Sequence, residues 1–206
     1  VLFYSDGFNG TVDDVEVYIE DQDRSVNNKG LQVYGTITKE PVATGAELVS
    51  YSGVSATNYL QQPYNSDLNF GTGDFSIFVW AKKNTFSTNH YIIDRARTTP
   101  SWATGNRSYF IINSNGYHRF KLAGGSQQDG DQSIMPAGVF TQIGFVRRSG
   151  IMELYFNGQL VQTIGGSNAS ASFDNGGTDM STTVNRYGDG FAADYTFDGM
   201  ALLRIS

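Results

Sequence analysis

The chain has 206 residues, of which 14% are aromatic and 17% charged, and its net charge is −6. This negative charge gives no electrostatic basis for nucleic-acid binding. The sequence has no cysteine, which excludes disulfides, thiolate metal sites and cysteine nucleophiles. No segment approaches the roughly 20 apolar residues of a membrane helix, so membrane insertion is not expected. Abundant Tyr, Phe and Gly favour strands joined by glycine turns, in one large β domain over residues 1–206.

The start of the chain contains two β-like runs, residues 12–19 and 31–37, with a polar acidic loop between them. Phe-Asn-Gly at residues 8–10 has a counterpart, Phe-Asp-Gly, at residues 197–199, and an apolar run follows each motif. Two interpretations are open. Either the first and last strands are neighbours in one sheet, or residues 1–38 are an extension or the tail of a preceding domain.

The strand that begins at Phe75 is apolar on both sides. Phe75, Ile77 and Val79 alternate with Phe78 and Trp80 along an extended segment. Since successive side chains of a strand point to opposite faces, both faces of this strand carry large apolar groups. The pattern predicts a strand in the middle of a sheet, covered on both sides within a sandwich, with Trp80 in the core.

Two further segments show the alternation of strands with one buried face. Residues 109–122 are predicted to form a hairpin around Asn115-Gly116, and residues 140–163 a three-stranded meander with its second turn at Asn157-Gly158. An Asn-Gly pair accepts the positive φ angles of a tight type I′ turn. Short strands at the spacing of roughly 8–12 residues that is typical of sandwiches, without any long amphipathic helix, predict an antiparallel all-β fold.

Three segments carry a family resemblance. Residues 68–82 contain an aromatic-Ser-Ile run that ends in Trp-Ala-Lys, residues 140–160 contain Arg-Ser-Gly and Leu-Tyr-Phe-Asn-Gly, and residues 197–205 form the last strand. In this order they resemble the laminin-G-like domains of the concanavalin A-like lectin/glucanase superfamily, over about residues 58–206. The resemblance implies an all-β, two-sheet antiparallel jelly-roll sandwich that binds glycans or proteins, often with one calcium ion at a loop rim.

Residues 23–31 and 63–68 also resemble parts of phage and marine metagenome virion proteins that carry such domains. This resemblance implies a domain of a larger virion or cell-surface protein, located outside the cell or on a virion surface and serving adhesion. The expected partners are a glycan or cell-surface polysaccharide, and other virion or surface proteins.

Acidic pairs are the signature of the enzymes in this superfamily. Retaining glycoside hydrolysis needs two carboxyl groups about 5–5.5 Å apart, which alternate positions on one strand face would supply. The central strands contain no such pair. Asp14 with Glu16, and Asp21 with Asp23, have the spacing but lie near the N-terminus, where solvated acidic residues are expected. No catalytic residue is therefore predicted, and a divergent glycan hydrolase or lyase is kept only as an alternative.

A polar loop around Trp102 is the predicted binding site. An exposed indole can stack on the apolar face of a sugar ring, with Arg97, Asn106 and Arg107 contacting hydroxyl groups. His118 joins them if its side chain points outward. The alternative is that Trp102 folds back as a lid over the sandwich. The predicted function is a non-catalytic carbohydrate-binding domain, and a structural protein–protein interaction module is the second hypothesis.

Calcium is the one cofactor that the sequence suggests. Hard oxygen ligands from loops suit this ion. Two acidic loops could supply them, and the candidate ligands are Asp129, Asp131, Asp174 and Asp179.

Overall fold

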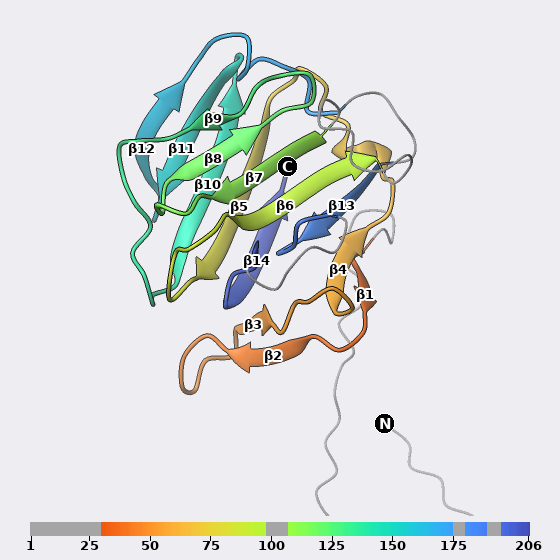
Figure 1. The fold of residues 1–206 in the computed structure, drawn as a ribbon, viewed down its shortest axis with the longest axis vertical. Helices are drawn as coiled ribbons and strands as arrows, with labels where there is room; N and C mark the ends of the chain where they lie inside the picture. The colour runs from red at the N-terminus through yellow and green to blue at the C-terminus, as the bar shows by residue number, and fades with distance from the viewer. Residues whose placement is uncertain (1–29, 98–106, 175–179, 189–194) are drawn as a thin grey trace, which may run out of the picture. The chain divides into compact units, whose positions relative to one another are not determined.

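The computed structural model describes residues 30–97, 107–174, 180–188 and 195–206. Fourteen strands and one 3-10 turn lie within these ranges (Figure 1): β1 (Gln32–Tyr34), β2 (Thr38–Pro41), β3 (Val49–Ser52), β4 (Tyr59–Gln62), η1 (Ser66–Leu68), β5 (Phe75–Lys82), β6 (His90–Arg97), β7 (Arg107–Ile112), β8 (His118–Lys121), β9 (Gln128–Asp129), β10 (Thr141–Arg148), β11 (Ile151–Phe156), β12 (Gln159–Ile164), β13 (Met180–Val184) and β14 (Gly199–Ile205).

The strands of the described residues form two antiparallel sheets of seven. One has the order β1-β4-β13-β6-β7-β8-β9 and is called the β6 sheet below. The other has the order β12-β11-β10-β5-β14-β3-β2 and is called the β5 sheet. Figure 1 shows strands β6 to β9 in one layer with β10 to β12 in the layer behind it. The predicted all-β sandwich of two antiparallel sheets is confirmed.

The core lies between the inner faces of the two sheets. Along β5, every second residue from Phe75 to Ala81 is buried, so this strand presents a continuous apolar row to the interior. Phe110 of β7 meets the rings of Phe75 and Phe145 edge-on, with ring centres 5.6 and 5.1 Å apart. Edge-to-face pairs add to the free energy gained from apolar burial. These contacts between the inner faces hold the two sheets together, and the outer faces are the surfaces on which a binding site could lie.

The meander confirms the turn chemistry read from the sequence. Strands β10 and β11 pair antiparallel, as do β11 and β12. Asn157 and Gly158 join β11 to β12 with φ angles of 50° and 76°, the left-handed values that a type I′ turn requires. The turn between β7 and β8 differs, since Gly116 has a φ of 83° but Asn115 does not have a positive φ, and the Gly116 N–H donates to the Asn113 carbonyl at 2.9 Å.

Trp80 is not in the core, which corrects the sequence-based prediction. It lies on the outer face of β5 with Phe78, and both side chains are half-buried. An apolar pattern on both faces fits a strand with one open face as well as one covered twice, so the pattern could not separate the two cases.

The predictions about the N-terminal region fall largely outside the described residues. The run at residues 12–19 is among them, so its pairing with the last strand stays a prediction. In the structure β14 lies between β5 and β3. Residues Leu31–Ser206 form one compact unit, and the single domain over residues 1–206 stays a prediction as well.

Candidate functional site

The outer face of the β6 sheet contains a buried ion pair. Arg107 begins β7 and Asp94 lies on the neighbouring strand β6. Arg107 Nε donates to Asp94 Oδ1 over 2.6 Å, and Arg107 Nη2 donates to the second carboxylate oxygen. The backbone N–H of Gly188 donates to Asp94 Oδ2 at 2.7 Å. Arg107 is 7% exposed and Asp94 1%, so the pair links β6, β7 and the segment after β13 beneath the surface.

Three tyrosines surround this ion pair. The Arg107 guanidinium lies 4.0 Å from the ring centre of Tyr187, 5.3 Å from that of Tyr109 and 5.4 Å from that of Tyr91. These are cation–π distances. Burial disfavours the charge of Arg107, but the facing Asp94 carboxylate outweighs it and raises the pKa of the guanidinium. Burial also disfavours the charged form of Tyr91, and for a phenol this raises the pKa, although the positive charge of Arg107 opposes the rise. Burial raises the pKa of Tyr109 as well, so Tyr91 and Tyr109 keep their phenol protons at neutral pH.

A continuous set of polar side chains adjoins the tyrosines, and we call it the Arg119 network. Arg119 of β8 donates to both carboxylate oxygens of Asp129 on β9, at 2.5 and 2.7 Å, and its Nη1 donates to Asn89 Oδ1 at 3.0 Å. Tyr109 Oη donates to Gln127 Oε1 at 2.8 Å, and Gln127 Nε2 lies 3.4 Å from Asp129 Oδ1. The network thus crosses from β7 to β9.

The Arg119 network is open to solvent, unlike the ion pair beside it. The Asp129 side chain is 42% exposed and that of Arg119 is 19% exposed. The hydrogen bond to Asp129 raises the pKa of Arg119. Each member holds its neighbour in place, and satisfied polar networks of this kind are rigid. The remaining lone pairs and N–H groups can bind the hydroxyls of a polyol. Tyr91 and Tyr109 are buried, so the half-buried Tyr187 is the tyrosine of this group that offers an apolar ring beside them.

The structure describes only part of the predicted sugar site. Trp102 and Asn106 lie outside the described residues. Arg97 ends β6, and its side chain is not described. Arg107 is placed in the ion pair beneath the surface, so a direct contact with a sugar hydroxyl is not the role its position supports. It positions Tyr109 and Tyr187 instead.

His118 does not point outward, which removes the condition for its predicted contact with sugar. It is 1% exposed and lies between the sheets, with its ring centre 4.1 Å from that of Phe156 and 5.0 Å from that of Phe145. Its Nε2 lies 3.0 Å from the carbonyl oxygen of Tyr155, and because a carbonyl only accepts, Nε2 carries the proton. Burial lowers the pKa of His118 to about 3, although the hydrogen bond to Tyr155 opposes this.

The predicted calcium ligands are engaged with other partners where they are described. Asp129 faces Arg119, whose positive charge opposes a cation there. Asp131 Oδ1 accepts from Gln162 Nε2 at 2.9 Å, and Asp174 Oδ2 accepts from the Gly71 N–H at 2.9 Å. Asp179 lies outside the described residues. Across the described ranges, no three His, Cys, Asp or Glu side chains gather as they would around a metal ion. Calcium stays a prediction.

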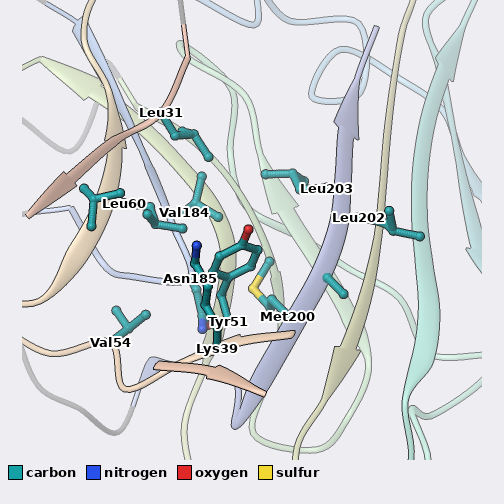
Figure 2. A pocket seen from close by; sticks show the side chains of 12 residues that line it. Leu31, Lys39, Tyr51, Val54, Leu60, Val184, Asn185, Met200, Leu202 and Leu203 are labelled. Carbon is teal, nitrogen blue, oxygen red and sulfur yellow. The ribbon is translucent and has the colours of Figure 1, made fainter. Parts of the chain in front are cut away.

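A second candidate is an apolar pocket of about 400 Å³ between the two sheets. Figure 2 shows Tyr51 and Met200 within it, with Leu60 and Val184 to one side and Leu203 to the other. Two polar residues, Lys39 and Asn185, also line the pocket. The Asn185 amide already has partners, because its Nδ2 donates to the Phe197 carbonyl at 3.3 Å and its Oδ1 accepts from the Phe197 N–H at 2.6 Å. This lining offers few groups for hydroxyls, so the Arg119 network is the better site for a sugar.

Sequence reasoning named Asp129 of the Arg119 network only as a calcium ligand and missed the other members, although a signal was present. The turn at Asn115-Gly116 sets a hairpin register in which Tyr109 pairs with Lys121 and Ile111 with Arg119. That register places Tyr109 and Arg119 on one face of the sheet. Extending the hairpin pattern to its outer face would therefore have indicated the cluster.

The comparisons with known proteins agree with this fold. The family model described as "Concanavalin A-like lectin/glucanases superfamily" (Laminin_G_3) matches residues 54–201. The comparison with curated proteins finds no match. No helix among the described residues is long and apolar enough to cross a membrane.

Three solved structures illustrate the likeness. Domain 4 of AbnA, a GH43 extracellular arabinanase from Geobacillus stearothermophilus, in complex with arabinotriose, is 17% identical with a TM-score of 0.62, covering 90% of this chain and 86% of that one. The Ruminococcus gnavus IT-sialidase CBM40 bound to α2,3 sialyllactose is 13% identical, with a TM-score of 0.53 and coverage of 68% and 78%. The binding domain of botulinum neurotoxin DC in complex with SialylT is 18% identical, with a TM-score of 0.57 and coverage of 85% and 42%. At these identities the likeness concerns the fold.

Proposed function

Because the chain belongs to the concanavalin A-like lectin/glucanases superfamily, we propose that it is a non-catalytic carbohydrate-binding domain whose glycan lies on the Arg119 network. The observation that carries this proposal is the array of donors and acceptors around Arg119, with the exposed Asp129 and the half-buried ring of Tyr187 close by. A sugar has hydroxyls that match such an array and an apolar ring face that matches an aromatic side chain.

The similar structures support a glycan as the ligand. Two of the three are described as complexes with arabinotriose or sialyllactose, and the third is a toxin binding domain in complex with SialylT. These ligands differ from one another, so the comparisons favour the class of ligand and leave its identity to experiment.

The environments of two site carboxylates support a binding role without catalysis. Hydrolysis of a glycosidic bond needs one carboxyl to act as an acid and a second to act as a base or nucleophile. The Asp94 side chain is fully buried against Arg107, and Asp129 is held by both arms of the Arg119 guanidinium. Both carboxylates are thus engaged as hydrogen-bond acceptors of a guanidinium, which is a structural role.

The wider setting is part of the proposal. The resemblance of residues 23–31 and 63–68 to virion proteins supports an adhesion domain of a larger virion or surface protein, outside the cell. The alternative is a protein–protein interaction module without glycan binding. The favouring observation is Val33, a lining residue of the apolar pocket that is 60% exposed.

A glycan array with the purified chain tests the proposal, run once with calcium and once with a chelator. We expect selective binding to a subset of glycans. A difference between the two arms would support the predicted calcium ion. Uniform absence of binding under both conditions would overturn the glycan proposal and favour the interaction module.

A further inference from the structure

The outer face of the β5 sheet carries a second aromatic cluster, on the opposite side of the sandwich from the Arg119 network. Phe78 and Trp80 both face outward from β5 and are half-buried. Tyr155 of β11 lies beside Phe78, with ring centres 6.2 Å apart. Large aromatic side chains on an open sheet face are typical of binding surfaces.

The Phe78 ring lies against a glycine on the neighbouring strand β10. Gly144 of β10 pairs with Phe78 in the sheet. A Cβ atom at residue 144 would lie 2.4 Å from Phe78 Cε1 and 3.0 Å from Tyr155 Cβ, which is closer than packed carbon atoms approach. The ring therefore rests directly on the β10 backbone, and the floor of this surface is fixed before any ligand arrives.

A bulge in β14 forms the wall beside this floor. Trp80 pairs with Ala201 and Phe78 pairs with Arg204, so two residues of β14, Leu202 and Leu203, lie opposite the single residue Val79 of β5. One of them, Leu202, has a φ of 49° and is 60% exposed. A left-handed leucine is strained, and such strain is concentrated at functional sites.

The floor and the wall enclose a hollow of about 580 Å³, within the roughly 300–1,000 Å³ of small-molecule sites. Trp80, Gln142 and Arg204 are among the residues that line it, and their side chains carry an indole N–H, an amide and a guanidinium group. None of these three side chains forms a hydrogen bond or ion pair with another of the residues that the structure describes. The hollow thus combines an apolar floor with available donors at its edge.

We propose that this hollow binds one sugar unit of a polysaccharide, with the apolar face of the ring on Trp80 and its hydroxyls at Gln142 and Arg204. A sugar ring presents an apolar face and a rim of acceptors together, as the hollow requires, whereas an acyl chain would leave the donors unmatched. The inference goes beyond the proposed function because it gives the chain a second, independent site. Two sites on opposite sheets raise the avidity for a long polysaccharide.

Tryptophan fluorescence tests this site directly. The chain has two tryptophans, so the variant Trp102→Phe leaves Trp80 as the only indole. Iodide quenching of Trp80 is measured against rising concentrations of soluble arabinan, galactan, mannan, xylan or β-glucan. We expect at least one of them to protect Trp80 in a saturable way. Arg204→Ala or Gln142→Ala should then raise the half-protecting concentration about tenfold, as expected for losing a hydrogen bond to the ligand.

Two matched controls lie in the same sheet outside the hollow. Arg148→Ala, at the exposed end of β10, and Gln159→Ala, on the edge strand β12, should leave the half-protecting concentration unchanged. Protection that persists in the Arg204→Ala and Gln142→Ala double variant would overturn the proposal. So would an absence of protection by every polysaccharide, or protection that rises with protein concentration alone, which would assign the face to a second copy of the chain.

The readout separates this inference from the proposed function. Protection of Trp80 reports on the β5 sheet alone, and the effect of Arg119→Ala on total glycan affinity reports on the β6 sheet. Either site can therefore fail in these measurements while the other is retained.

Discussion

Arg107 and Asp94 form a forked ion pair on the outer face of the β6 sheet, with Arg107 Nε donating to Asp94 Oδ1 over 2.6 Å. The pair is buried, and a buried pair stabilises a fold mainly through the cost of leaving one charge without the other. It also fixes the Tyr187 ring, which covers the guanidinium at 4.0 Å. Stability and the shape of the candidate site are thereby coupled.

Asp94→Asn tests this coupling. The substitution leaves the Arg107 guanidinium buried without a counter-charge, so we expect the free energy of unfolding to fall by about 3 kcal/mol. Urea denaturation of the variant and the parent chain gives this difference. Glu47→Gln, which removes an exposed carboxylate, serves as the control and should change the stability by less than about 0.5 kcal/mol. Equal losses in both variants would contradict the role given to the pair.

His118 should make stability depend on pH. Its folded pKa is about 3, below the ordinary 6.5, so the unfolded chain takes up a proton in this interval and the folded chain does not. The contribution of neutral His118 is complete above pH 6.5 and is lost as pH falls toward 3, with a slope of up to about 1.4 kcal/mol per pH unit.

Urea denaturation at pH 7, 6, 5 and 4 measures this slope in the parent chain and in His118→Gln, whose amide can still donate to the Tyr155 carbonyl. The variant should lose stability less steeply between pH 6 and 4. Parallel curves for the two proteins would show that His118 is not the group responsible.

Arg147 joins two loops to the β5 sheet through backbone contacts. Its Nε, Nη1 and Nη2 atoms donate to the carbonyls of Gly73, Ala171 and Gly71 at 2.7, 2.6 and 2.7 Å. Arg147→Ala leaves these acceptors without the donor, and we expect a loss of about 3 kcal/mol or more. Arg147→Lys should recover less than half of this lost stability, because a compact ammonium group cannot reach all three carbonyls as the guanidinium does. Thermal unfolding measures these differences. Full stability in the lysine variant would contradict the role given to the three hydrogen bonds of the guanidinium.

Two substitutions at Asn157, in the turn between β11 and β12, distinguish the effect of the backbone conformation on stability from that of the side-chain hydrogen bond. Asn157 has a φ of 50°, and its Oδ1 accepts from the Gln142 N–H at 3.0 Å. Asn157→Ala loses the hydrogen bond and strains the backbone, so we expect a loss of roughly 1–2 kcal/mol. Asn157→Gly keeps the left-handed φ without strain and should lose less. Equal thermal unfolding temperatures for the two variants would contradict this division.

The sequence predicted the sheets better than the site, and the reason is physical. Alternation and an Asn-Gly pair are local signals, and both hairpins formed as expected. Burial of Arg107 depends on Asp94, 13 residues earlier on another strand, and no local pattern reveals that pairing. His118 is polar and was expected to face outward only conditionally. It lies inside, where the Tyr155 carbonyl, 37 residues away in sequence, accepts a hydrogen bond from its Nε2.

Trp80 is the opposite case, a residue that was predicted to be buried and is partly exposed. Its apolar surroundings along β5 predicted a covered position, yet Trp80 is half-buried on the outer face of the sheet, where the bulge in β14 lies beside it. Bulges arise from the pairing of strands that are distant in sequence, here β5 and β14, so the exposure of Trp80 could be recognised only in the folded sandwich.

The affinity of Arg119→Ala for a glycan identified on the array tests the central claim most directly. Isothermal titration calorimetry is run on the parent chain, on Arg119→Ala and on Arg148→Ala, which removes an equally charged residue from the other sheet. We predict that Arg119→Ala weakens binding by about tenfold or more, as for a charged hydrogen bond, while Arg148→Ala binds like the parent. Equal affinities for all three proteins would contradict a glycan site at the Arg119 network.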